Sequence, residues 1–323
     1  MPLFTHAELA DAAKLVHQQV PATPQYSWPT INKRAGCEVW VKHENHTPTG
    51  AFKVRGGVTF LHWLQQAYPD VAGIITATRG NHGQSQARSA TAAGLGSKIL
   101  VPNGNSKEKN TAMRAFGAEV IEHGKDFNDA VEEALRLADA ENLFMVPAFH
   151  PELIRGVATY ALELFSAVKE LDVVYVPIGC GSGICSLITA RDAMGLSTRI
   201  VGVVATEAPA AKHSFEAGYR VSSVSASTFA DGAAVRVPVE GAFEIYSKGA
   251  DSIVEVSEAQ IAEAMRMIFH DTHNIAEGAG AMGLAALLQD ENRFGKRSAF
   301  VLSGGNIDTD MFAQVLAGGV PAA

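Results

Sequence analysis

The stretch VVYVPIGCGSGI, residues 173–184, decides the fold of this chain. Its first five residues, Val173–Pro177, form an almost continuous apolar run of the kind that is buried on both faces of a parallel sheet. A glycine-rich turn follows and leads into a helical pattern. Glycines in such a turn let successive backbone N–H groups close around a phosphate at a helix N-terminus; a purely structural turn is the alternative. The stretch lacks the Lys-Ser or Lys-Thr of a Walker A loop and the third glycine of a dinucleotide-binding loop.

Short strand-like segments alternate with helical patterns on both sides of this stretch. The strand-like segments are 38–41, 73–76, 98–101, 119–122, 143–146, 200–204 and 299–302. The helical patterns are 7–20, 83–93, 107–115 and 127–140, and the most loop-like region is 218–241. Thr5 and Glu8 predict a capping box before the first helix, and Asp126 is the expected N-cap of the helix at 127–140. Because alternating strands and helices build layered folds, we expect an α/β protein with open parallel sheets.

The composition is that of an ordinary globular protein and favours a small-molecule partner. At 323 residues the chain is long enough for about two domains. Its 26 Lys and Arg against 34 Asp and Glu give a net charge of −8, which disfavours nucleic acid and anionic membranes as partners. Three cysteines, Cys37, Cys180 and Cys185, offer no disulfide framework, so a reducing cytoplasm is the expected location. The sequence has no leader pattern and no run of 18 apolar residues, so we expect no membrane partner.

A lysine lies at an expected helix start within PTGAFKVRGG, residues 48–57. Lys53 is flanked by the apolar residues Phe52 and Val54. The positive end of the helix dipole and the apolar neighbours both favour a neutral amine, which is the form that Schiff-base chemistry needs. A solvated lysine on a surface turn is the alternative.

Two further segments end strands with polar groups. TATRGNHGQ, residues 76–84, could receive a carboxylate through its hydroxyl, amide and backbone N–H groups, although a helix N-cap at Asn81 explains the segment as well. In LSGGN, residues 302–306, Ser303 could hydrogen-bond a ring nitrogen, or the segment could simply be a tight turn. In open α/β sheets, ligands bind where strands end, so these segments are expected to meet.

In combination the four segments resemble the fold type II, or tryptophan synthase β-like, family of pyridoxal-phosphate enzymes. The resemblance is strongest to the threonine/serine dehydratase and serine racemase branch and extends from about Lys42 to Asn306. It implies a discontinuous large cofactor-binding domain, 1–64 and 148–323, with a small α/β domain, 65–147, inserted into it. It also implies pyridoxal 5'-phosphate as cofactor and a homo-oligomer, most simply a dimer.

The resemblance also implies roles for individual residues. Lys53 is expected to be the catalytic lysine that bonds to the cofactor aldehyde. The expected cofactor-binding residues are Phe52, Lys53, Asn81, Gly179, Cys180, Gly181, Ser182, Gly183, Glu277 and Ser303. The expected substrate-binding residues are Thr78, Arg79, Gly80, Asn81 and His82.

The implied activity is an ammonia-lyase, or dehydratase, reaction. Water would be eliminated across the α- and β-carbons of a 3-hydroxy amino acid to give a 2-oxo acid and ammonia. Threonine, serine, 3-hydroxyaspartate and phenylserine-like compounds are all candidate substrates. A neutral Ser303 at the ring nitrogen favours prompt β-elimination over transamination.

Arg79 departs from the family pattern, because relatives generally carry a small residue at this position and the racemases use a serine there. Racemisation is therefore disfavoured. A guanidinium beside the carboxylate loop could bind a second anionic group, which makes 3-hydroxyaspartate a candidate, unless Arg79 points outward or into an ion pair.

Several alternatives stay open. An amino-acid racemase or a β-replacement enzyme would use the same lysine and glycine loop, and a non-catalytic small-molecule sensor is the alternative outside the enzyme class. No metal is expected: Glu207 lies where relatives often hold a divalent cation, but Lys212 and His213 follow it in place of oxygen ligands. About 17 residues follow Asn306, so no regulatory C-terminal domain of the biosynthetic threonine dehydratases is expected.

Overall fold

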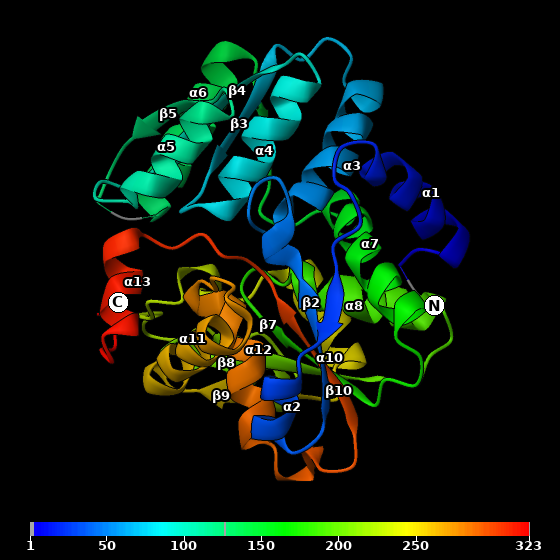
Figure 1. Cartoon of the computed structure of the whole chain (residues 1–323). Helices are drawn as coiled ribbons and strands as arrows, with labels where there is room; N and C mark the ends of the chain where they lie inside the picture. Colours follow the sequence, from blue (N-terminus) through cyan, green and yellow to red (C-terminus); the bar gives the residue numbers. More distant parts are fainter. Residues whose placement is uncertain (1–2, 126, 323) are drawn as a thin grey trace.

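The computed structural model describes residues 3–125 and 127–322, which form two sheets, one above the other in Figure 1. The larger sheet has the strand order β1-β2-β10-β7-β8-β9, and the smaller has the order β5-β4-β3-β6. The strands of the larger sheet are β1 (Gln25–Ser27), β2 (Glu38–His43), β7 (Val173–Pro177), β8 (Arg199–Ala205), β9 (Ser252–Val256) and β10 (Arg297–Leu302). Those of the smaller sheet are β3 (Gly73–Ala77), β4 (Gly96–Val101), β5 (Glu119–Glu122) and β6 (Phe144–Met145).

The apolar runs of the larger sheet are buried on both faces because helices cover both. Val173 and Tyr175 of β7 belong to the core under α11 (Glu258–Thr272) and α12 (Gly278–Gln289), whereas Val174 and Val176 belong to the core under α7 (Pro151–Ala167) and α8 (Ser182–Ala193). This alternation is the side-chain period of a strand. It explains why β7 has no polar face.

Helices pack around each sheet, and one helix runs between the two (Figure 1). Around the larger sheet these are α1 (His6–His17), α2 (Pro29–Ala35), α7 (Pro151–Ala167), α8 (Ser182–Ala193), α9 (Ala210–Ala217), α10 (Glu240–Gly249), α11 (Glu258–Thr272), α12 (Gly278–Gln289) and α13 (Thr309–Leu316). Around the smaller sheet they are α4 (Asn81–Ala92), α5 (Lys107–Ala115) and α6 (Phe127–Glu141). The helix between them is α3 (Lys53–Ala67), and the short 3-10 turns are η1 (Glu44–His46), η2 (Asp231–Ala233) and η3 (Glu291–Arg293).

The predicted α/β fold with parallel sheets is confirmed. Every neighbouring pair of described strands is parallel except β1 with β2, an antiparallel edge that we did not predict. The capping box before α1 is confirmed, since Glu8 N donates to Thr5 Oγ1 and Thr5 N donates to Glu8 Oε2. The predicted cap Asp126 lies outside the described residues.

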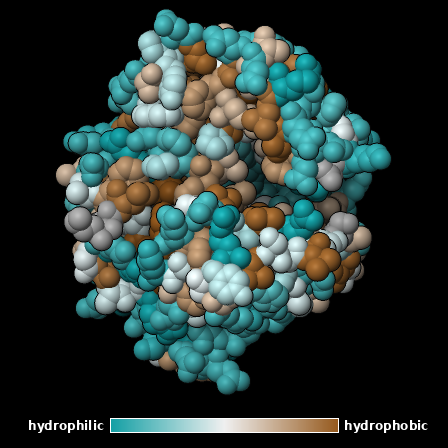
Figure 2. Space-filling view, turned by 180° about the vertical axis from the view of Figure 1, so that it is seen from behind, coloured by the Kyte–Doolittle hydropathy of each residue, from teal (hydrophilic) through white to brown (hydrophobic). Residues whose placement is uncertain are grey.

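The strands of the smaller sheet lie between residues 73 and 145, and those of the larger sheet lie before and after them in the chain. The division into a large domain, 1–64 with 148–323, and a small domain, 65–147, remains a prediction. Figure 2 shows a hollow between the upper and lower parts of the molecule, with hydrophobic residues gathered around it on an otherwise mainly hydrophilic face. Across the part of the chain that the structure describes, no helix has the length and apolarity needed to cross a membrane.

Candidate active site

Four helices begin around one site, at the carboxyl ends of β3, β7 and β10. They are α3, which begins at Lys53, α4 at Asn81, α8 at Ser182 and α12 at Gly278. Each helix start presents unpaired N–H groups and the positive end of a dipole. The convergence therefore favours a ligand with negatively charged groups.

Lys53 reaches from α3 to the glycine-rich loop. Its Nζ donates a hydrogen bond to Ser182 Oγ at 2.7 Å and lies 5.0 Å from the centre of the Phe52 ring. Burial lowers the pKa of Lys53, and the nearby Cys180 and Glu277 only partly oppose this shift. Because the ammonium form is disfavoured, the neutral amine is more accessible to Lys53 than to an exposed lysine.

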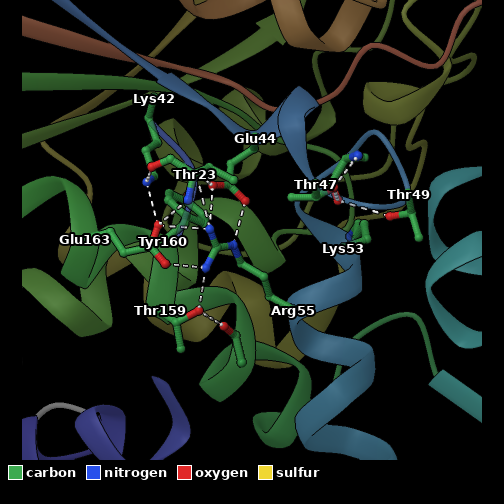
Figure 3. Close-up of polar contacts among 12 residues, drawn as sticks. Thr23, Lys42, Glu44, Thr47, Thr49, Lys53, Arg55, Thr159, Tyr160 and Glu163 are labelled. Carbon is green, nitrogen blue, oxygen red and sulfur yellow. Dashed lines mark hydrogen bonds and ion pairs between the residues drawn. The ribbon is translucent and has the colours of Figure 1, made fainter. Parts of the chain in front are cut away.

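The turn that precedes Lys53 is fixed by its own hydrogen bonds (Figure 3). Thr47 Oγ1 accepts a hydrogen bond from Ala51 N at 2.9 Å and donates one to Ala51 O at 2.8 Å. Phe52 N donates to the carbonyl oxygen of Ser303 at 3.1 Å, and Ala51 pairs with Gly304 in an isolated antiparallel bridge. The lysine turn and the SGGN turn are therefore held together through the backbone.

The glycine-rich loop leaves its backbone donors free. Within the described chain, none of the N–H groups from Gly179 to Gly183 donates to a protein acceptor. A Cβ on Gly179 would lie 2.1 Å from the carbonyl oxygen of Gly232, and Gly181 has a φ of +97°, a conformation that favours glycine. Free N–H groups around a helix start form an anion-binding cradle that side chains at these positions would fill or distort.

Asn81 links the start of α4 to the larger sheet. Its Nδ2 donates to Glu277 Oε1 at 2.7 Å, and its Oδ1 accepts a hydrogen bond from Asn306 Nδ2 at 2.8 Å. Asn306 Nδ2 also donates to the carbonyl oxygen of Thr49 at 2.7 Å. The side chain of Asn81 thus does not cap its own helix, for which Gly80 is the N-cap.

Glu277, the N-cap of α12, is a buried carboxyl beside a buried lysine. Burial raises the pKa of Glu277 to about 7, with the charge of Lys109 opposing the rise and that of Asp231 adding to it. Lys109 Nζ lies 3.9 Å from Glu277 Oε2 and forms a short ion pair with Asp231. Glu277 Oε2 has no hydrogen-bond partner among the described residues. A carboxyl with a pKa near neutrality can hold or release a proton under physiological conditions.

The predicted carboxylate loop contains side chains in very different surroundings. Thr78 is buried, and its Oγ1 accepts a hydrogen bond from Gly80 N at 3.1 Å. A Cβ on Gly80 would lie 2.6 Å from Cδ of Lys109, so a side chain there would collide with that lysine. Burial, together with the charge of Lys53, lowers the pKa of His82 to about 3, which keeps the imidazole neutral. Arg79 is exposed and makes no ion pair or hydrogen bond with any residue that the structure describes.

Comparison with known proteins identifies the family. Residues 16–304 match the family model described as "Pyridoxal-phosphate dependent enzyme". The chain is 32% identical over 315 residues to an L-threonine ammonia-lyase of Thermotoga maritima, covering 97% of this chain and 78% of the relative. It is also 32% identical to the catabolic L-threonine dehydratase TdcB of Escherichia coli K12, over 88% of each chain. The solved structure of maize serine racemase superposes with a TM-score of 0.90 at 25% identity and 97% coverage of both chains.

The chain belongs to the pyridoxal-phosphate-dependent enzyme family. The resemblance inferred from the sequence is therefore confirmed, together with the fold type and the cofactor. The site of this family member also fits the cofactor physically. The glycine loop offers free N–H groups to a phosphate, and the amine of Lys53 lies within hydrogen-bond distance of that loop.

The structure brings most of the predicted residues together. Lys53 lies against Phe52 and Ser182, Asn81 against Glu277, and the backbone of Ser303 against Phe52. The side chains of Arg79, His82, Cys180 and Ser303 make no hydrogen bond or ion pair with any described residue, and of these four only Arg79 is exposed.

Three residues of the site were not predicted from the sequence. Asn306 stands in the SGGN segment, three positions after Ser303, so its amide was a visible candidate. Asp231 lies within the loop-like region 218–241, and Lys109 lies in the first turn of α5, where no pattern distinguishes it from a solvated helix lysine.

Proposed function

We propose that this protein is a pyridoxal-phosphate-dependent ammonia-lyase that eliminates water from a 3-hydroxy amino acid, giving a 2-oxo acid and ammonia. The observation that carries the proposal is the amine of Lys53, with its lowered pKa, beside an anion cradle at the start of α8. The names of the relatives support the same reaction class, since two of them are a threonine ammonia-lyase and a threonine dehydratase.

In this proposal the site residues divide the work of holding the cofactor. Gly179, Cys180, Gly181, Ser182 and Gly183 hold the phosphate, with Ser182 Oγ adding a hydroxyl donor to the backbone N–H groups. Lys53 would bond to the aldehyde, and Phe52 would be a neighbour of the ring. Asn81 would be the partner of the phenolic oxygen, Ser303 that of the ring nitrogen, and Glu277 would line the cofactor side of the site. When bound, the cofactor delocalises the negative charge that removal of the α-proton leaves on the substrate.

The chain's own groups then bind the substrate and move its proton. Thr78, Gly80 and Asn81 receive the substrate carboxylate at the start of α4, where the helix dipole favours an anion. Lys53, whose pKa is lowered by burial, accepts the α-proton as a neutral amine. His82 stays neutral, so it adds no positive charge that would compete with the start of α4 for the substrate carboxylate.

Arg79 leads to the finer part of the proposal, the choice of substrate. An exposed guanidinium without an ion-pair partner among the described residues is available to a second carboxylate. We therefore place 3-hydroxyaspartate beside threonine and serine as a substrate. Cytoplasmic location, a homodimeric assembly and the division into domains 1–64 with 148–323 and 65–147 belong to the same proposal.

The test is a substrate panel with the cofactor-loaded protein. Threonine, serine, both diastereomers of 3-hydroxyaspartate and 3-phenylserine, each in both α-configurations, are assayed for 2-oxo acid and ammonia. The proposal predicts equal amounts of both products from at least one compound. Inversion of the α-carbon without release of ammonia would instead establish the racemase alternative, and no turnover with an intact cofactor band would contradict the lyase assignment.

A further inference from the structure

Arg55 lies two residues after Lys53 on α3 and is completely buried, although nothing in the proposed chemistry uses it. Its guanidinium donates hydrogen bonds to two carboxylates. Nε and Nη2 donate to the two oxygens of Glu44 at 2.7 and 3.0 Å, and Nη1 and Nη2 donate to the two oxygens of Glu163 at 2.6 and 2.9 Å. Figure 3 shows Arg55 between these two residues, with Lys53 at the start of the same helix. Two bidentate contacts fix the plane of a guanidinium as well as its position.

The charges of this cluster balance. Lys42 Nζ donates to Glu163 Oε2 at 2.6 Å and to the carbonyl oxygen of Thr23 at 2.8 Å, so two cations meet two carboxylates. Lys42 and Glu44 are as fully buried as Arg55. Taking such charges out of water is expensive, and apolar residues of similar size often stabilise a protein as well or better. A purely stabilising role therefore gives no reason to place the cluster only two residues from the lysine.

Helix α7 connects this cluster with the glycine loop. Thr159 and Glu163 of α7 both accept hydrogen bonds from Arg55 Nη1. Between them in sequence, Tyr160 packs edge-on against Phe52, with ring centres 6.2 Å apart, and its hydroxyl donates to the carbonyl oxygen of Gly183 at 3.0 Å. One helix thus holds both Arg55, beside the lysine, and Gly183, within the phosphate cradle.

The backbones of α3 and α7 touch at the same place. A Cβ on Gly156 would lie 2.2 Å from the carbonyl oxygen of Arg55, and a Cβ on Gly56 would lie 2.7 Å from that of Leu153. Helix α3 begins just before this contact, at Lys53, and its N-cap residue Phe52 provides no side-chain hydrogen bond. The start of α3 therefore depends on tertiary contacts, among them the hydrogen bonds of Arg55 to Glu44 and Glu163.

We propose that Arg55 is a positioning residue for the reaction: with Glu44 and Glu163 it fixes the start of α3 on α7, and through α7 and Tyr160 it sets Lys53 at the correct distance from the phosphate cradle. This inference rests on the proposed function of Lys53. Arg55 touches neither substrate nor cofactor, and it acts through the placement of one amine.

The test compares Arg55→Lys with the matched exchange Arg136→Lys. Arg136 pairs with Glu133 on the exposed face of α6 and is 63% exposed, so its exchange is expected to change nothing. Each apo-variant is mixed with pyridoxal phosphate, and the visible absorption band of the lysine-bound cofactor gives the rate of bond formation. Fluorescence quenching gives the affinity for pyridoxamine phosphate, which binds the cradle but cannot bond to a lysine.

For Arg55→Lys we expect bond formation and kcat to fall on the order of 10- to 100-fold, while KM and pyridoxamine phosphate affinity change by less than about threefold. A lysine at position 55 keeps the charge but loses the two bidentate contacts. An unchanged rate of bond formation in the folded variant would overturn the proposal, even if the variant melts at a lower temperature.

If Arg55→Lys does not fold, Tyr160→Phe decides the question. This variant keeps the ring against Phe52 and loses only the hydrogen bond to Gly183. Slower bond formation with unchanged thermal stability would support the proposal, and an unchanged rate would overturn it. Because bond formation needs no substrate, absence of lyase activity in the natural protein would contradict the proposed function without deciding the role of Arg55.

Discussion

Exchange of Glu163 for glutamine removes one of the two carboxylates that neutralise Arg55 and Lys42 in the protein interior. Glu163 accepts hydrogen bonds from Arg55 Nη1 and Nη2, from Lys42 Nζ and from Thr23 N, and its Oε1 lies 2.8 Å from His17 Nε2. A glutamine of the same size keeps the volume but leaves an excess of buried positive charge. Breaking a buried pair in this way costs about 3–5 kcal/mol.

The pKa of Glu163 gives an independent value for the stability that this carboxylate contributes. Although burial alone would raise the pKa of this carboxyl, the charges of Arg55 and Lys42 lower it from 4.5 to about 2. This difference corresponds to about 3 kcal/mol of stability at neutral pH. Because the folded-state pKa is the lower one, the stabilisation is complete above about pH 4.5 and is lost as the pH falls towards 2.

Thermal unfolding at several pH values measures this contribution. With an unfolding entropy of about 2.1 cal/mol/K per residue, a loss of 3–5 kcal/mol in 323 residues lowers Tm by about 4–7 °C at pH 7. The difference in Tm between the two proteins should narrow between pH 4.5 and pH 3. The control is Glu133→Gln, which breaks an exposed pair with Arg136 on α6 and should have little effect. An equal loss of Tm for Glu163→Gln and Glu133→Gln would refute the reasoning. So would a difference in Tm between Glu163→Gln and the natural protein that does not change with pH.

Three further predictions concern the site itself. Gly179→Ala should lower the unfolding free energy by about 1–3 kcal/mol, because its Cβ would meet the carbonyl oxygen of Gly232. Gly183→Ala should lower it by less than about 0.5 kcal/mol, because the atom nearest to its Cβ would be 3.6 Å away. Denaturant unfolding compares the two, and equal costs would contradict the close approach. Burial raises the pKa of Glu277 to about 7, so folding favours its protonated form. The unfolding free energy of the cofactor-free protein, minus that of Glu277→Gln, should therefore decline from about pH 4.5 to pH 7. A flat or rising difference in unfolding free energy would be inconsistent with the buried carboxyl. Arg79→Ala should reduce kcat/KM for 3-hydroxyaspartate about 10- to 100-fold and for threonine by less than about threefold, and similar losses with both substrates would eliminate the second-anion hypothesis.

The parts of the site that the sequence predicted are those encoded by neighbouring residues. The glycine loop could be recognised because Gly179–Gly183 directly follow an apolar strand, and Lys53 because it stands in a glycine-bearing turn before a helix. The short edge strand β1 escaped prediction because its residues QYS have no extended apolar pattern.

The missed parts depend on contacts between distant segments. The ion pair of Lys109 with Asp231 spans 122 positions. Asn81 and Glu277 were each predicted as site residues, but the hydrogen bond between them, across 196 positions, was not. The same holds for the cluster around Arg55, whose partner Glu163 lies 108 positions further along the chain. Each charged residue of this cluster looks like an ordinary surface charge in the sequence, and only the packing of α3 and α7 with the end of β2 buries these residues together.

The central claim is that the amine of Lys53 bonds to the cofactor. The most direct measurement is reduction of the cofactor-loaded protein with borohydride, followed by proteolysis and mass spectrometry of the labelled peptide. Our account predicts a single phosphopyridoxyl group on the peptide that contains Lys53, and none in Lys53→Ala. A label on another lysine, or no label in a protein that nevertheless releases ammonia from a hydroxy amino acid, would contradict it.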